Sequence, residues 1–178
     1  AGYDDDNHVR LSAAGSRRYM PGPSKGWHVR SPMTFFGSAF GKDRFVAVGE
    51  WGTIAISNDG KEWNVALSGT QVSLRAIAFG MDVFVAVGDN GTILTSPDGD
   101  KWTMRSSESE VLLQGVAAGN GLFLAAGEKG VLRKSMDGVA WAAVDSGIHD
   151  SLRQITFADG RFLAAGDGGA ILTSRDGS

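Results

Sequence analysis

The chain has 178 residues and a formal net charge of −3, and Gly is its most frequent residue, with 26 copies. This length can bury the core of one sizeable domain, and the Gly-rich composition favours short strands joined by tight turns over long helices. The acidic balance predicts no nucleic-acid partner, and the absence of cysteine excludes disulfides, thiolate catalysis and Cys-ligated zinc.

The first 26 residues carry no periodic pattern and are expected to form an irregular N-terminal segment. The chain holds no run of about 20 apolar residues, so no membrane insertion is predicted. The acidic run Asp4–Asp6 lacks the spaced oxygen ligands of a calcium loop, and the three histidines show no metal-ligand spacing. No metal and no cofactor are therefore expected.

From residue 27 onward the chain repeats with a period of 39 residues. The segment Phe45–Gly49 returns three times at this step, at 84–88, 123–127 and 162–166. A second series of the form Ser-x-Asp-Gly starts at Ser57 and keeps the same step, at 96, 135 and 174. Two series in one register indicate four copies of one structural unit.

Each unit contains four expected strands, here named a, b, c and d in chain order. In the second unit they are predicted at Leu74–Phe79, Phe84–Val87, Thr92–Ser96 and Trp102–Arg105. Strand b is almost continuously apolar and rich in alanine, which is typical of a strand covered on both faces. Because its short turns require antiparallel pairing, the sequence predicts an all-β fold. We expect a β-propeller of four-stranded antiparallel blades over residues 27–178.

The Ser-x-Asp-Gly-x-x-Trp element falls at the turn between strands c and d. Asp can accept hydrogen bonds from backbone N–H groups two or three residues later, and Gly can adopt the positive φ that the turn needs. Recurrence in every unit predicts structural roles for these side chains rather than a catalytic array. The residues concerned are Asp59, Asp98, Asp137, Asp176, Trp63, Trp102 and Trp141.

At these motifs the sequence resembles the Asp-box (BNR-type) propeller repeats of sialidases, sortilin-type receptors and bacterial photosystem II assembly-factor-like proteins. The resemblance covers about residues 27–178. The usual box has one more residue between Asp and Gly, and the shorter form found here is more typical of the assembly-factor-like group. The resemblance favours a bacterial periplasmic or secreted location, although the sequence itself does not identify the compartment.

The fourth unit stops at Ser178, before its own Trp and strand d. Residues 27–31, which begin with Trp27, look like the missing strand and are predicted to complete the last blade of a four-bladed ring. Two alternatives remain open at this stage. The chain is a section of a larger ring, or it shares a ring with a second chain, in which case an open edge predicts a homo-oligomer.

An acidic residue follows the glycine that ends strand b in every turn between strands b and c. These residues are Glu50, Asp89, Glu128 and Asp167. They are predicted to border the mouth of the central channel, where a cation or a polyhydroxylated ligand would bind. The alternative is internal pairing, with Arg75 and Arg153 as partners of the two aspartates and a hydrogen bond from Gln114 to Glu128.

The first unit departs from this rule and supplies the best candidate for a binding patch. Trp51 occupies its b–c turn, Phe36 replaces the arginine, and the preceding connection contains Met33 and Phe35. Exposed aromatic and methionine side chains anchor protein interfaces, and aromatic rings stack on sugars. The alternative is that Trp51 covers Phe36 and fills the space left by the short connection.

Three functions remain compatible with the sequence. The first is a non-catalytic binding or assembly scaffold for a protein or glycan partner, which uses the face bearing the b–c turns and d–a connections. The second is a sialidase-like glycoside hydrolase or a lectin, with Glu108 and Glu110 as available carboxylates. No catalytic residue is assigned. The resemblance to sialidases would require a Tyr nucleophile, and the only tyrosines, Tyr3 and Tyr19, lie in the N-terminal segment. The third is a structural module of a larger assembly.

Overall fold

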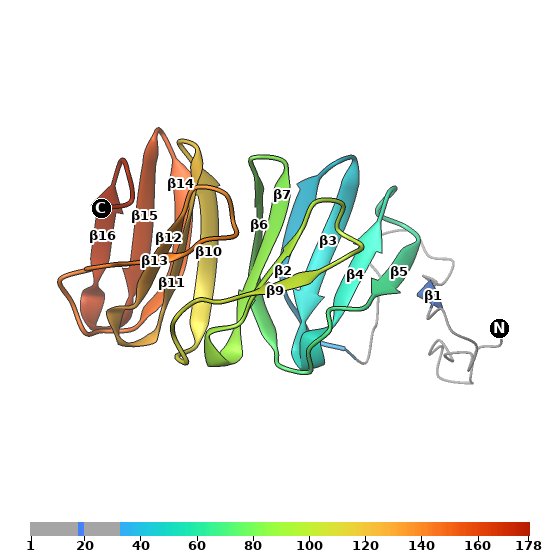
Figure 1. Ribbon diagram of the computed structural model, residues 1–178, viewed down its shortest axis with the longest axis horizontal. Helices are drawn as coiled ribbons and strands as arrows, with labels where there is room; N and C mark the ends of the chain where they lie inside the picture. The colour runs from blue at the N-terminus through green and yellow to red at the C-terminus, as the bar shows by residue number, and fades with distance from the viewer. Residues whose placement is uncertain (1–17, 20–32) are drawn as a thin grey trace.

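The computed structural model describes residues 18–19 and 33–178, which form four antiparallel sheets in chain order (Figure 1). Sheet 1 contains β1 (Arg18–Tyr19), β2 (Phe35–Gly41), β3 (Arg44–Gly49), β4 (Ile54–Ser57) and β5 (Trp63–Ala66). Sheet 2 contains β6 (Leu74–Gly80), β7 (Val83–Gly88), β8 (Ile93–Ser96) and β9 (Thr103–Arg105). Sheet 3 contains β10 (Leu113–Gly119), β11 (Leu122–Gly127), β12 (Leu132–Ser135) and β13 (Ala142–Val144). Sheet 4 contains β14 (Leu152–Ala158), β15 (Arg161–Gly166) and β16 (Ile171–Ser174).

Strands a to d of each repeat pair as a simple meander, as predicted. In sheet 2 the order is β6-β7-β8-β9, and sheets 1 and 3 repeat it. The described part of sheet 4 has strands a, b and c. In sheet 1 the short strand β1 pairs with β5 through Arg18 opposite Asn64, so this sheet gains an outer strand that the sequence did not predict.

The sheets stand side by side in chain order, and neighbouring sheets meet chiefly along their first strands. β2 contacts β6, β6 contacts β10, and β10 contacts β14. Figure 1 shows sheet 1 and sheet 4 at opposite ends of this row. The strand predicted at 27–31 lies outside the described residues.

The hydrophobic core consists of three clusters, one at each junction between neighbouring sheets. At the first junction Phe84 and Ala86 of β7 pack against sheet 1, whereas Val85 and Val87 of the same strand pack against sheet 3. Alternate residues of a strand point to opposite faces, so an apolar strand b fills two junctions at once. Strand b is therefore covered on both faces in the middle of the row, as its composition predicted.

The glycine that ends each strand b is required by close approach rather than by its backbone angles. Gly88 has φ −168°, which any residue adopts. A Cβ atom placed there would lie 2.1 Å from the carbonyl oxygen of Ser73, just before strand a of the same sheet. The repeated Phe-x-Ala-x-Gly pattern thus ends in Gly because the backbone of the preceding connection occupies the space of a side chain.

Among the described residues there is no helix long and apolar enough to span a membrane.

Candidate functional site

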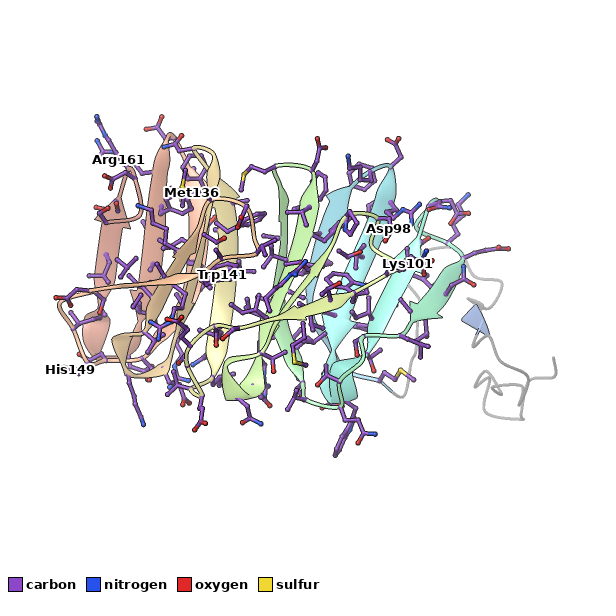
Figure 2. The ribbon with its side chains drawn as sticks, viewed as in Figure 1. Asp98, Lys101, Met136, Trp141, His149 and Arg161 are labelled. Atoms are coloured by element: carbon purple, nitrogen blue, oxygen red, sulfur yellow. The ribbon has the colours of Figure 1, made fainter. Side chains whose placement is uncertain are left out.

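The turns of the repeat are divided between two opposite faces of the row. Turns between strands a and b and between c and d lie on one face, and the b–c turns and d–a connections lie on the other. Figure 2 shows Met136 and Arg161, from turns of the first kind, at the upper end of the molecule, and His149, from a d–a connection, at the lower end. We call the second face the loop face.

The c–d turns are held by a repeated set of hydrogen bonds. In sheet 2 the Oδ1 atom of Asp98 accepts the N–H groups of Asp100 and Lys101, both at 2.9 Å. The Ser96 hydroxyl donates to the same oxygen at 3.0 Å and accepts the N–H of Gly99 at 2.7 Å. Trp102 closes the turn, since its Nε1 donates to the Gly99 carbonyl at 2.8 Å.

The same contacts recur around Asp59 and Asp137. In these turns the backbone N–H groups hold the pKa of Asp59, Asp98 and Asp137 below the usual range of an aspartate. At Asp176 the pKa is lowered first by the hydroxyl of Ser174. In every turn the Oδ1 atom of the aspartate accepts hydrogen bonds from its own turn, so the geometry supports a structural role.

Two of the tryptophans that follow these turns, Trp102 and Trp141, belong to the junctions, whereas Trp63 of sheet 1 is in none of the three core clusters. Trp141 is buried in the cluster between sheets 2 and 3, with its ring centroid 6.4 Å from that of Phe123. Trp102 packs partly buried at the first junction, 6.5 Å from Phe84. Beside Phe162 of sheet 4, where the earlier sheets hold these rings, there is a groove of about 140 Å³ bordered by Leu172 and Ser178.

Every b–c turn is a single 3₁₀ turn with the same backbone. The turns are η1 (Glu50–Gly52), η2 (Asp89–Gly91), η3 (Glu128–Gly130) and η4 (Asp167–Gly169). The N–H of each acidic residue donates to the carbonyl that precedes strand a, as in the 3.0 Å bond from Asp89 to Ser73. The second residue of each turn is left-handed, with φ between 55° and 63°. The acids are thus presented at equivalent places on the loop face.

Two of the four acids form the ion pairs expected from the sequence. The Arg75 guanidinium donates through Nε to Asp89 at 2.7 Å, and Arg153 donates through Nε to Asp167 at 2.8 Å. Each arginine is the extra residue of a β-bulge in strand a. A bulge redirects its side chain, and here it aims the guanidinium at the b–c turn. The arginine lowers the pKa of Asp167, and the carboxylates raise the pKa of both arginines.

The hydrogen bond predicted between Gln114 and Glu128 is wrong. In the described part of the chain, Nε2 of Gln114 is buried without a hydrogen-bond partner. Glu50 and Glu128 instead act on the arginine of the next sheet, because their charges help to raise the pKa of Arg75 and Arg153, respectively. Each arginine thus lies in the field of two carboxylates, and the two arginines offset half of the negative charge of this row of acids.

The aromatic residues of the first unit occupy different places. Trp51, in η1, is 78% exposed and adopts φ 55°. Met33 lies against the same turn, where its Sδ accepts the hydroxyl of Thr53 at 3.7 Å. Phe36 is contacted by Arg75, whose Cζ lies 4.7 Å from the ring centroid. Phe35 occupies the repeat position of Leu74, which faces the preceding sheet. The Phe35 side chain therefore lies on the free side of sheet 1 and not beside the turn.

A groove of about 510 Å³ lies beside η2 on the loop face, and its lining includes Met104, Glu108 and Glu110. Arg133, from sheet 3, secures its wall by donating to the carbonyls of Ser107 at 2.7 Å and Glu108 at 3.2 Å. The sequence analysis missed this role. The available signal was that Arg133 stands where the other units place the apolar or small residues Ala55, Leu94 and Leu172.

In the described ranges, no three His, Asp or Glu side chains gather closely enough to hold a metal ion.

Known structures share the arrangement of the sheets. No protein-family model matches the chain, and no curated protein matches it. The crystal structure of the computationally designed Ika4 protein is similar with a TM-score of 0.62 and 16% identity, over 82% of this chain and 92% of Ika4. The structure of YCF48 bound to D1 peptide gives 0.60 and 20% over 85% of this chain, and a nidogen/laminin complex gives 0.65 and 14% over 81%.

These similarities show the fold: the chain is built as β-propeller blades. Its four sheets account for 52% of the YCF48 chain and 61% of the chain in the nidogen/laminin complex, so the chain spans little more than half of those proteins. At identities of 20% or less they carry no information on individual site residues. Membership of the Asp-box family stays a prediction.

Proposed function

We propose that the chain is a non-catalytic scaffold that binds a protein segment on its loop face, with Trp51 as the main anchor and Met33 beside it. The observation that carries the proposal is the large exposed ring of Trp51 at a left-handed turn position. A left-handed backbone costs a non-Gly residue about 1–2 kcal/mol, and this cost is not offset by burial, because the ring is largely exposed. Trp51 and Phe36 are 78% and 41% exposed, so burial of one ring by the other does not account for Trp51.

The corresponding turns support this reading by contrast. Their second residues are Asn90, Lys129 and Gly168, which are small or polar. Trp is among the residues most enriched at protein–protein binding hot spots, and a methionine next to it adds an adaptable apolar contact. Two of the similar structures are complexes, one of YCF48 with a peptide and one of nidogen with laminin, which favours a protein partner.

The row of acids plays a secondary part in this proposal. Asp89 and Asp167 are engaged by arginines, so we assign Glu50 and Glu128 as the acids that remain available to polar groups of a partner. Phe35 would contribute only if the partner extended from η1 onto the free face of sheet 1. A glycan stacked on Trp51 is the alternative ligand of the same place.

A peptide selection tests the proposal. A phage-displayed library of random 12-residue peptides is panned on the immobilised chain, and the binders are measured against two variants. Trp51→Asn introduces the residue found at position 90 and keeps the turn, whereas Met136→Ala changes an exposed side chain on the opposite face. We expect Trp51→Asn to weaken binding at least tenfold and Met136→Ala to leave it unchanged. A selection without binders, or binders indifferent to Trp51→Asn, would contradict the proposal.

The groove beside η2 favours one second candidate, a glycoside-active site that uses Glu108 and Glu110. Hydrolysis of aryl glycosides distinguishes it from the scaffold. Turnover by the wild type that is lost in Glu108→Gln or Glu110→Gln would replace the scaffold with an enzyme, and absence of turnover would remove this candidate.

A further inference from the structure

The two outer faces of the row expose positions that are buried in every internal junction. On sheet 4, Leu163 is 41% and Ile171 is 70% exposed. One or more repeats earlier, their equivalents lie in the junctions and are buried. These equivalents are Val46, Val85 and Leu124 for position 163, and Ile54, Ile93 and Leu132 for position 171. We call the surface formed by Thr156, Leu163, Ala165, Ile171 and Thr173 the C-terminal end face.

The free side of sheet 1 exposes the positions that form the other half of each internal junction. Phe45 is 39% exposed, although Phe84, Phe123 and Phe162 at the same repeat position are completely or almost completely buried. Phe40, at 55% exposed, corresponds to Phe79 and Phe157, which pack at junctions. We call the surface formed by Phe35, Ser38, Phe40 and Phe45 the N-terminal end face.

Internal junctions show which residues of the two end faces would meet. Gly99 of sheet 2 lies against Val46 of sheet 1, and Gly177 of sheet 4 lies against Leu124 of sheet 3. The next member of this series is Gly60 against Leu163. A second series joins Gly41 to Phe79 and Gly119 to Phe157. Across the end faces the equivalent positions hold Ala158 and Phe40, and a Cβ at the glycine position of an internal junction would lie only 2.2 Å from the Phe157 ring. The Phe40 ring, which is exposed, must therefore turn aside for the two end faces to meet as the two halves of one more junction.

Side-chain sizes at the first strands limit how closely the two end faces can approach. Strands a of neighbouring sheets approach so closely that a Cβ on Gly115 would lie 2.9 Å from the backbone of Ile155. The position of Gly115 is occupied on the C-terminal end face by the larger Gln154. The position of Ile155 is occupied on the N-terminal end face by the smaller Ser38. Ser38 lacks the Cγ2 atom that would lie 3.2 Å from such a Cβ at the internal junction, but the backbone contact remains. The Gln154 side chain must therefore lie along the sheet for the end faces to pack.

We propose that a second copy of this chain covers both end faces by stacking head to tail, which closes a ring of eight sheets from two chains. A head-to-tail contact produces either a closed ring or an open filament. With two copies related by a twofold axis, both junctions form and no apolar end face remains. A partner of unrelated sequence would have to reproduce the repeat register on two different surfaces, whereas a second copy carries it already.

The rim of the new junction provides one unfavourable contact. At the first internal junction Lys42 pairs with Asp82 at 2.7 Å. The equivalent positions across the end faces are Asp159 and Asp43, which repel each other. Asp159→Lys restores the internal pairing and is expected to tighten the dimer a few-fold at low salt, because exposed pairs contribute about 0.2–1 kcal/mol.

Light scattering on the full chain tests the proposal. We expect the wild type to have twice the 18.7 kDa mass of the chain. Leu163→Glu on the C-terminal end face and Phe40→Glu on the N-terminal end face should each give a monomer with unchanged circular dichroism. The control Leu67→Glu changes a side chain in a d–a connection that is 90% exposed, and this variant should remain dimeric.

Mixing the two end-face variants distinguishes head-to-tail stacking from other dimers. Leu163→Glu keeps an intact N-terminal end face, and Phe40→Glu keeps an intact C-terminal end face. Their mixture is expected to form a one-to-one dimer through a single junction, although neither variant associates alone. A monomeric wild type at all concentrations, a mass that grows without limit as concentration rises, or a mixture that stays monomeric would each overturn the proposal.

Discussion

The internal junctions and the end faces are built from the same repeat positions, yet the same side chains are buried in one place and exposed in the other. Phe123 packs between sheets 2 and 3 beside Trp141, whereas Phe45 stands at the free side of sheet 1 beside Phe40. In a stack of repeats each unit is stabilised by its neighbours rather than by its own fold. The comparison shows that burial here is a property of the junction and not of the repeat sequence.

The largest expected effect separates the two environments directly. Phe123→Ala should lower the free energy of unfolding by about 3–5 kcal/mol, because it removes a completely buried ring and leaves a cavity. Phe45→Ala should cost about 1–2 kcal/mol in the monomer, because its ring is already partly hydrated. Urea unfolding at low protein concentration measures both. Equal losses would show that the end face of sheet 1 is covered within the chain.

A smaller effect is expected at the c–d turns. Asp98→Ala should cost about 1 kcal/mol at pH 7, since the N–H groups of Asp100 and Lys101 lose their acceptor. Asp98→Asn keeps an acceptor oxygen and should cost less. The two variants therefore separate the hydrogen bonds from the charge.

The lowered pKa of Asp98 also predicts the direction of its pH dependence. The contribution is complete above the unfolded-state pKa, about 3.9, and is lost as pH falls through the lower folded-state pKa. Unfolding free energies between pH 6 and pH 2 should fall less steeply in Asp98→Asn than in the wild type. Identical slopes would show that this carboxylate contributes nothing as a charge.

The smallest expected effects belong to the two ion pairs. Arg75→Gln should cost less than about 1 kcal/mol, and Arg153→Gln still less, because the Arg153–Asp167 pair is more exposed and no aromatic contact accompanies it. Double-mutant cycles with Asp89→Asn and Asp167→Asn isolate each pair. A larger coupling for Arg153 than for Arg75 would reverse this order.

The repeat made most of the fold predictable. A strict 39-residue step located the strands of sheet 2 to within about one residue, and the apolar composition of strand b indicated two covered faces. Pairing of Arg75 with Asp89 followed from the same register. These features are local or repeat in every unit, so one unit predicts the others.

Departures from the repeat were the part that sequence could not place. Gln114 replaces an arginine, and whether its amide reaches Glu128 depends on the path of a bulged backbone, which the residue type does not reveal. The sequence groups Phe35 with Trp51 because the d–a connection and the b–c turn share a face, but strand alternation places Phe35 on the end face of sheet 1. A β-bulge shifts this alternation by one residue, and no sequence pattern marked it.

Hydrogen–deuterium exchange of β15 and β16 tests most directly whether an end face is one half of a junction. In the wild type at dimer-forming concentration, the paired amides of these strands should exchange as slowly as those of β7 and β8. Phe40→Glu should accelerate them, although residue 40 lies in the sheet at the opposite end of the chain. Fast exchange in the wild type, or exchange unaffected by Phe40→Glu, would contradict the account.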